Sequence, residues 1–286
     1  MTKKFILLFI LSGICCCASA VKVTSLEFRN DAESKKKFLA QDVSIWHRGQ
    51  FRIKDGEKGA VITISNAKAR CAFWLLGKED ANGSWFPKIG MLLPSKANFD
   101  YYEFFKFAND KLRSEKCSVS ISNVENGGFT LNFTQKDFKA EARFVMQEDD
   151  EKVYCTFKAP GQNTVSLLIY PSSFGGSYKE GLNLRKRFGV TPVRTLPFGK
   201  RVSLAGNEPW VFLADSYFDP AQNRGDGPCA VLWHPGKVKP EVSVGNYSCM
   251  VHLTGKEEFS FVLFSFHKQS NDAGLKLMKA LPLEFK

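Results

Sequence analysis

FKAEARFVMQEDDEKVYCTF, residues 138–157, alternates apolar and polar side chains in two successive runs. The apolar positions are Phe138, Ala140, Ala142, Phe144 and Met146 in the first run, and Val153, Cys155 and Phe157 in the second. Successive side chains of a β-strand point to opposite faces, so this period of two predicts two strands that each bury one face. The polar residues 148–151 between the runs are few enough for a hairpin turn.

The same alternation extends along the chain in both directions. Further strands are predicted at 26–28, 51–53, 61–64, 71–76, 117–121, 129–133, 210–214, 229–233, 242–253 and 259–267, with hairpin turns at 125–128, 135–137 and 160–163. More than twelve short strands with few helices predict an all-β protein, a large antiparallel β-sandwich. Large secreted β-sandwiches with a dozen or more strands recur among carbohydrate-handling proteins, and the mutarotase-like supersandwich is one such fold. We expect residues 171–200, which lack sustained alternation, to form a crossover with short strands.

Short helices are expected near both ends of the strand-rich region. SNDAGLKLMKAL, residues 270–281, begins with the capping residue Ser270 and repeats apolar side chains about one turn apart. DAESKKKFLA, residues 31–40, offers Asp31 as a cap. Residues 98–114 have helical spacing, but their aromatic content also suits an extended rim.

The first twenty residues have the layout of a secretory signal peptide. Lys3 and Lys4 precede an apolar run, and a small-residue triplet ends at Ala20, where cleavage is expected. We therefore expect a single β-sandwich domain over residues 21–286, secreted or periplasmic, with no transmembrane segment. Lipid anchoring through Cys15, Cys16 or Cys17 is disfavoured, because Ile14 is not the small residue that a lipoprotein signal places before its cysteine.

The chain is basic, with a formal net charge of +11, or +9 without the two leader lysines. Such a charge favours anionic partners, for example an acidic polysaccharide or a phospholipid headgroup, or it serves solubility alone. Nucleic acid is not expected, since an exported protein without a compact basic-aromatic motif is poorly suited to it. Five cysteines follow the leader, an odd number that excludes complete pairing within the chain; a Cys229–Cys249 bond is one option.

ADSYFDPAQNRGDGPCAVLWHP, residues 214–235, concentrates polar side chains between two predicted strands. His234 with Asp215 or Asp219 could form an imidazole–carboxylate pair for acid–base chemistry, with Arg224 as a basic partner. The alternative is a long turn, because Asp before Pro or Gly is typical of turns. The spacing matches no metal motif, so neither a metal nor another cofactor is expected.

A second candidate site combines aromatic and basic residues. Trp85, in the turn-like NGSWFP, and Tyr101 and Tyr102 could be exposed for stacking on sugar rings, near Arg185 and Arg187. The large excess of phenylalanine over tyrosine instead indicates a buried core for most of the aromatic residues.

Three functions therefore stay open. The first is a non-catalytic exported module that binds a glycan or an anionic envelope component. The second is a carbohydrate-active enzyme of lyase or epimerase type that uses the His234 and aspartate cleft. The third is a structural or protein-assembly module. The sequence does not determine the oligomeric state.

Overall fold

Two antiparallel β-sheets form most of the protein in the computed structural model, which describes residues 21–39, 53–92, 103–125, 127–170, 187–216, 228–245, 248–266 and 269–282. The smaller sheet has the order β1 (Lys22–Phe28), β2 (Glu57–Ser65), β3 (Arg70–Glu79), β4 (Trp85–Leu92). The prediction of an all-β sandwich is confirmed.

The larger sheet has eleven strands, eight of them in the order β10-β12-β13-β15-β9-β8-β7-β6. Their bounds are β6 (Ser118–Glu125), β7 (Gly128–Gln135), β8 (Phe138–Met146), β9 (Lys152–Ile169), β10 (Arg187–Val190), β12 (Trp210–Asp215), β13 (Cys229–Trp233) and β15 (Cys249–Ser265). Off this path, β5 (Phe105–Ala108) pairs with β9, and β11 (Arg201–Ser203) pairs with β14 (Val238–Val244), which pairs with β15.

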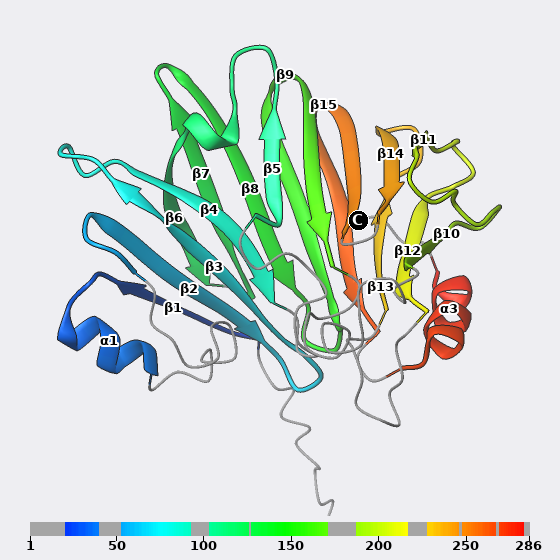
Figure 1. The fold of residues 1–286 in the computed structure, drawn as a ribbon, viewed down its shortest axis with the longest axis horizontal. Coiled ribbons are helices and arrows are strands. Elements are labelled where there is room, and N and C mark those ends of the chain that lie inside the picture. The colour runs from blue at the N-terminus through cyan, green and yellow to red at the C-terminus, as the bar shows by residue number, and fades with distance from the viewer. Residues whose placement is uncertain are drawn as a thin grey trace, which may run out of the picture.

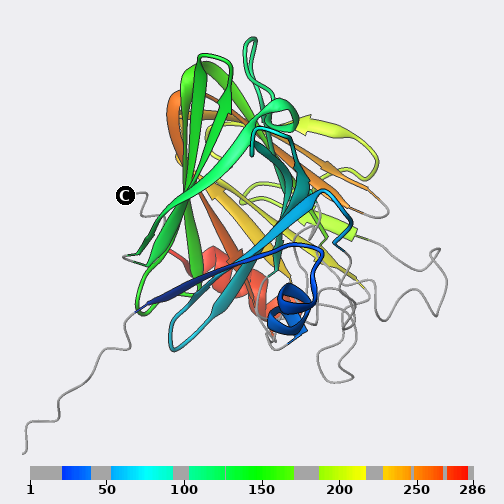
Figure 2. The same cartoon turned by 90° about the vertical axis from the view of Figure 1, so that its left-hand side faces the viewer.

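The strands β9 and β15 are unusually long, and together they carry the sheet around a corner (Figures 1 and 2). They pair with each other along both halves, with a register shift between Lys256 and Glu258. At this point Gly161 of β9 has φ 80° and Glu257 of β15 has φ 48°. The predicted hairpin turn at 160–163 is therefore wrong, because its Pro-Gly pair bends one continuous strand instead of reversing it.

The corner divides the larger sheet into two layers whose inner faces meet. The N-terminal half of β9 joins β8, β7 and β6, whereas its C-terminal half joins β5. The smaller sheet packs on the inner face of β7 and β8, which β5 also contacts. The ring centroid of Phe73 in β3 lies 4.8 Å from those of Phe129 in β7 and Phe144 in β8, and that of Phe105 in β5 lies 5.8 Å from Phe144.

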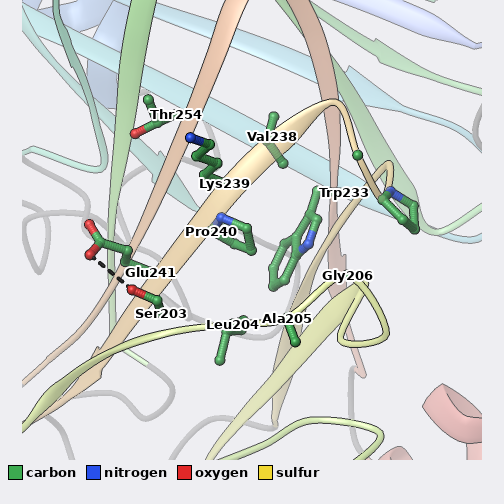
Figure 3. Close-up of a pocket in the computed structure, with 12 residues that line it drawn as sticks. Ser203, Leu204, Ala205, Gly206, Trp233, Val238, Lys239, Pro240, Glu241 and Thr254 are labelled. Atoms are coloured by element: carbon green, nitrogen blue, oxygen red, sulfur yellow. Dashed lines mark hydrogen bonds between the residues drawn. The ribbon is translucent and has the colours of Figure 1, made fainter.

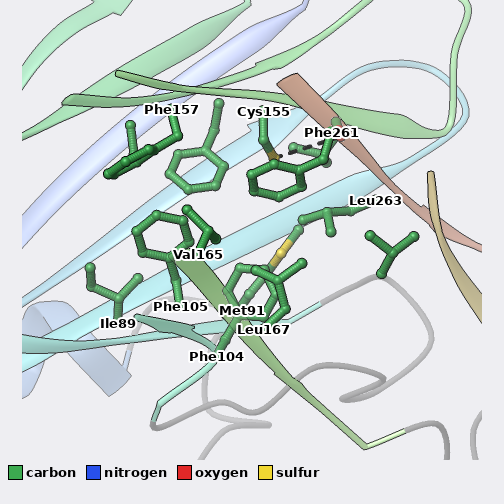
Figure 4. Close-up of a cluster of buried hydrophobic side chains, with 14 of the residues drawn as sticks. Ile89, Met91, Phe104, Phe105, Cys155, Phe157, Val165, Leu167, Phe261 and Leu263 are labelled. Carbon is green, nitrogen blue, oxygen red and sulfur yellow. Dashed lines mark hydrogen bonds between the residues drawn. The ribbon is translucent and has the colours of Figure 1, made fainter. Parts of the chain in front are cut away.

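The core between the layers is rich in phenylalanine (Figure 4). The ring of Phe157, from one half of the corner, lies 6.2 Å from that of Phe105 and 4.9 Å from that of Phe107, on the strand paired with the other half. All three side chains are at most 2% exposed. The apolar residues of both runs in the opening stretch, 138–146 and 153–157, contribute to this core, as the period of two predicts.

The two predicted helices are confirmed, and the described part of 98–114, whose sequence suits either a helix or an extended rim, contains a strand. Helix α3 (Asn271–Ala280) begins after Ser270, whose hydroxyl accepts a hydrogen bond from the backbone N–H of Ala273. Its Met278 packs on the outer side of β12, β13 and β15. Helix α1 (Ala32–Leu39) begins after Asp31, which accepts from the backbone N–H of Ser34. In the third candidate, residues 105–108 form strand β5; residues 98–102 lie outside the described part. No helix among the described residues is long and apolar enough to cross a membrane.

The backbone at the corner gives a first prediction. Replacing Glu257 by glycine should raise the free energy of unfolding by about 0.5–1 kcal/mol, because a left-handed conformation is strained for a residue with a Cβ. The matched change Glu258→Gly, in an ordinary strand position, should lower it by about 0.5–1 kcal/mol. Urea unfolding of both variants measures the difference. A loss of stability in Glu257→Gly as large as in Glu258→Gly would contradict a left-handed corner.

Candidate functional site

A cleft of about 450 Å³ opens beside strand β14 (Figure 3). One wall is β14 itself, from Val238 to Glu241, and the other is the segment 203–206, which begins with the last residue of β11. The two walls approach each other where the backbone N–H of Leu204 donates to the carbonyl of Pro240, 3.0 Å away. Trp233, at the end of β13, lies between them.

The cleft combines an apolar lining with a few polar groups. The buried side chains of Leu204, Trp233, Val238 and Pro240 form its apolar part. Its polar lining residues are Ser203, Lys239, Glu241 and Thr254. Pockets that bind small ligands commonly have this composition, and their usual volume range of about 300–1,000 Å³ includes this one.

The wall 203–206 is held by a buried carboxylate. Glu208 is 2% exposed, and one of its carboxylate oxygens accepts from the backbone N–H of Ala205 at 2.9 Å. Arg194 binds both carboxylate oxygens, at 3.0 Å each, and its Nη2 also donates to the carbonyl of Ser203 at 3.1 Å. The hydroxyl of Thr191 donates to Glu208 at 2.7 Å. These five hydrogen bonds fix the position of the wall.

The ionisation of Glu208 follows from the same contacts. Burial opposes the charged form, but the hydrogen bonds from Arg194, Ala205 and Thr191 outweigh it and lower the pKa of Glu208. The carboxylate therefore stays charged, and its attraction to Arg194 persists, at neutral pH.

On the outer face beside the cleft, Glu241 binds two residues of β11. Arg201 forms an ion pair with it, and the Ser203 hydroxyl donates to it at 3.3 Å. The next strand, β15, places His252 directly opposite Glu241. Burial, and then the nearby Arg201, lower the pKa of His252, while Glu241 opposes the shift; the ring is therefore neutral at pH 7.

Of the four predicted catalytic residues, the structure describes two, Asp215 and His234, and it does not bring them together. Asp215 ends β12, where the loop to β13 begins, and it is 1% exposed. His234 follows the far end of β13, about 20 Å away along the hairpin, and bonds the neighbouring carbonyl of Pro235 at 2.6 Å. The expected His234–Asp215 pair is therefore wrong. Asp215 lies at the loop end of the β12–β13 hairpin, whereas His234, which follows the second strand, lies at the open end. Asp219 and Arg224 lie outside the described residues.

The expected exposure of Trp85 is also wrong. The turn lies at 80–84, where Asp80 accepts from the backbone N–H groups of Asn82 and Ser84. Trp85 is then the first residue of β4, 3% exposed, and its indole N–H donates to the carbonyl of Lys58 at 2.9 Å. Its ring is therefore closed to stacking on a ligand.

Arg187 also differs from the expected exposed basic group. It is 3% exposed in β10, pairs across the sheet with Asp215, and its guanidinium carbon lies 5.7 Å from the centre of the Tyr170 ring. The rest of this candidate site, Tyr101, Tyr102 and Arg185, falls outside the described residues.

The five described cysteines are buried and form no disulfide, so the predicted Cys229–Cys249 bond is not formed. The cross-strand neighbours of Cys229 are Leu213 and Ser265, whereas those of Cys249 are Val244 and Ile169. Burial raises the pKa of the Cys249 thiol to about 12. Among the described residues, no group of three or more His, Cys, Asp or Glu side chains is arranged to hold a metal ion.

Comparisons with known proteins found distant structural likenesses. No family model and no curated protein matches the chain. It is similar to a 4-α-glucanotransferase from Thermococcus litoralis, with 10% identity and a TM-score of 0.31 over 71% of this chain and 37% of that one. It is also similar to a heparinase III, with 11% identity and a TM-score of 0.34 over 84% of this chain and 41% of that one. The chain thus spans about two fifths of either protein.

The Glu208 network gives a second prediction. Glu208→Gln should lower the free energy of unfolding at pH 7 by about 1–3 kcal/mol, because a neutral amide cannot accept all of these hydrogen bonds. A lowered pKa in the folded state means that the stabilisation is complete above the unfolded value of about 4.5 and is lost as pH falls through the folded value.

Urea unfolding of wild type and variant across this pH range tests the prediction. The gap in stability should narrow below pH 4.5. The exposed Glu258→Gln is the control, and it should change stability little at either pH. An unchanged gap from pH 7 to pH 3 would show that the charge of Glu208 is not what holds the wall.

Proposed function

We propose that this protein is a non-catalytic binding module that takes an acidic glycan in the cleft between β14 and the segment 203–206. The observation that carries the proposal is the lining of that cleft, which combines four polar side chains with apolar residues. A sugar ring likewise has both apolar and polar surface, because its C–H groups and its hydroxyl groups occupy different parts of that surface.

The polar groups suit hydroxyl-rich ligands. Glu241 accepts hydrogen bonds, Lys239 donates them, and the hydroxyls of Ser203 and Thr254 do both. The exposed apolar lining residues Ala205 and Pro235 would gain free energy by excluding water from the C–H surface of a bound ring. Together they would fix the orientation of a sugar as well as its affinity.

The charges around the cleft favour an acidic sugar. Glu241 is neutralised by Arg201, whereas Lys239 makes no ion pair within the described part of the chain. Lys237 and Lys256 are also exposed nearby, two residues from Lys239 and from Thr254 along their strands. A carboxylate on the ligand would complement this positive edge, and the net charge of +9 without the two leader lysines would raise its local concentration.

The lining favours binding over hydrolysis. Glycoside hydrolysis commonly uses two carboxylates on either side of the scissile bond. Among the described residues that line the cleft, Glu241 is the one carboxylate and no histidine is present. The module would therefore bind its ligand without cleaving it.

We also propose that the protein acts outside the cytoplasm, secreted or periplasmic. The proposal rests on the signal-peptide pattern of residues 1–20, which lie outside the described residues. Expression in a bacterial host followed by mass spectrometry of the exported chain should give a mature N-terminus at Val21. A chain retained with Met1 would overturn it.

Titration calorimetry with a galacturonic acid dimer gives a third prediction. Wild type should bind it, and Ala205→Trp, which fills the cleft from an exposed position, should abolish binding. Lys239→Ala should weaken binding about tenfold, because one charge-assisted hydrogen bond is lost.

The matched control is Lys158→Ala, an exposed lysine on β9 that does not line the cleft, and it should leave affinity unchanged. The neutral maltose should bind more weakly than the acidic dimer. Equal binding of the dimer by wild type and Ala205→Trp would exclude the cleft, and no binding of either sugar by wild type would overturn the proposed function.

A further inference from the structure

A row of polar side chains crosses five strands on the outer face of the layer that contains the cleft. Cross-strand pairing joins Lys106 of β5 to Ser166 of β9, then to His252 of β15, Glu241 of β14 and Ser203 of β11. Adjacent strands lie about 4.8 Å apart, so the row is about 19 Å long. Its alternate neighbours along each strand, such as Val165 and Leu253, are buried in the core.

Hydrogen bonds between neighbouring side chains organise this face. The Ser166 hydroxyl lies 2.8 Å from Nδ1 of His252. In the adjacent row the hydroxyls of Thr164 and Thr254 lie 2.9 Å apart. Apart from His252, these side chains are small, so a ligand can approach the sheet closely. Each hydroxyl keeps further capacity to donate or accept.

The face is continuous with the cleft. Ser203 and Glu241 end the first row, and Thr254 belongs to the second, beside Lys239. All four of these residues also line the cleft. A chain molecule with one unit in the cleft would therefore reach His252 and Ser166 with its next units.

The charges on the row suit the same acidic ligand as the cleft. Lys106 is exposed at one end, paired with Glu103, and Arg201 and Lys239 are exposed at the other. His252, neutral at pH 7, has Nδ1 engaged by Ser166, while its Nε2 makes no hydrogen bond within the described residues. A neutral imidazole binds sugar hydroxyls without adding charge.

We propose that this outer face is an extended track for a linear acidic polysaccharide, running from the cleft across β14, β15 and β9 to β5. The inference rests on the proposed function and adds to it the length and direction of the ligand. The cleft holds one end of the bound segment, and the hydroxyl pairs and His252 hold the units that follow.

Chain length distinguishes the track from the cleft. By titration calorimetry, a galacturonic acid octamer should bind wild type at least tenfold more tightly than the dimer, because additional hydrogen bonds form along the row. His252→Ala and Thr164→Val should each reduce affinity for the octamer about fivefold and leave affinity for the dimer unchanged.

Strand β9 offers a matched control. Thr156→Val removes the same hydroxyl from the same strand, but on the outer face of the other layer, where Thr156 lies 3.0 Å from Ser260. It should leave affinity for both ligands unchanged, and circular dichroism of Thr164→Val and Thr156→Val checks that both fold.

Each contrary result overturns a defined part of the inference. If the octamer binds no more tightly than the dimer, the track is refuted and the proposed function of the cleft still stands. If neither the octamer nor the dimer binds, the track and the proposed function are both refuted. If Thr156→Val weakens octamer binding as much as Thr164→Val does, the octamer is not bound specifically by the outer face that contains Thr164. Self-association in sedimentation that His252→Ala abolishes would assign the face to a second copy of the chain and overturn the track.

Discussion

The pairing of β9 with β15 through a shared corner is the constraint on which the rest of the structure depends. Each strand belongs to both layers of the larger sheet, so the hydrogen bonds between them continue from one layer into the other. The corner needs one residue in the left-handed region on each strand, Gly161 and Glu257. Because the strands stay paired through the bend, both layers present their inner faces to the same core.

The packing of the core and the position of the cleft follow from that bend. Val165 and Leu167 on one half of β9 face inward, as do Cys155 and Phe157 on the other half. The residues between them, Thr164 and Ser166, must then face outward, and their counterparts on β15 are Thr254 and His252. The polar face beside the cleft is thus the alternate set of the residues that build the core.

Local patterning predicts the strands well and the connections between them poorly. The alternation at 138–157 and the strand 229–233 appear in the structure as predicted. A Pro-Gly pair, in contrast, suits a hairpin and a bend equally, and only the partner strand β15 decides for the bend at 160–163. Trp85 shows the same limit, since one residue of difference in the extent of a turn determines whether its ring is exposed or buried.

The candidate site could not be assembled from sequence, because its residues come from separate segments without a shared motif. Ser203, Trp233, Glu241 and Thr254 meet only through the order of β11, β14, β15 and β13 in the sheet. The single stretch 214–235, in contrast, contributes residues to both ends of a hairpin, with Asp215 at one end and His234 at the other.

The Arg194–Glu208 pair supports a specific role for the wall of the cleft. A buried carboxylate loses hydration, and well-packed apolar side chains often stabilise a fold as much as such a pair does. Directional hydrogen bonds to Ala205 and Ser203 have an effect that apolar packing lacks, since they hold the backbone of an otherwise exposed segment in one position. That segment faces Pro240 and Glu241 across the cleft. A fixed wall keeps the cleft open before the ligand arrives, which lowers the cost of ordering on binding.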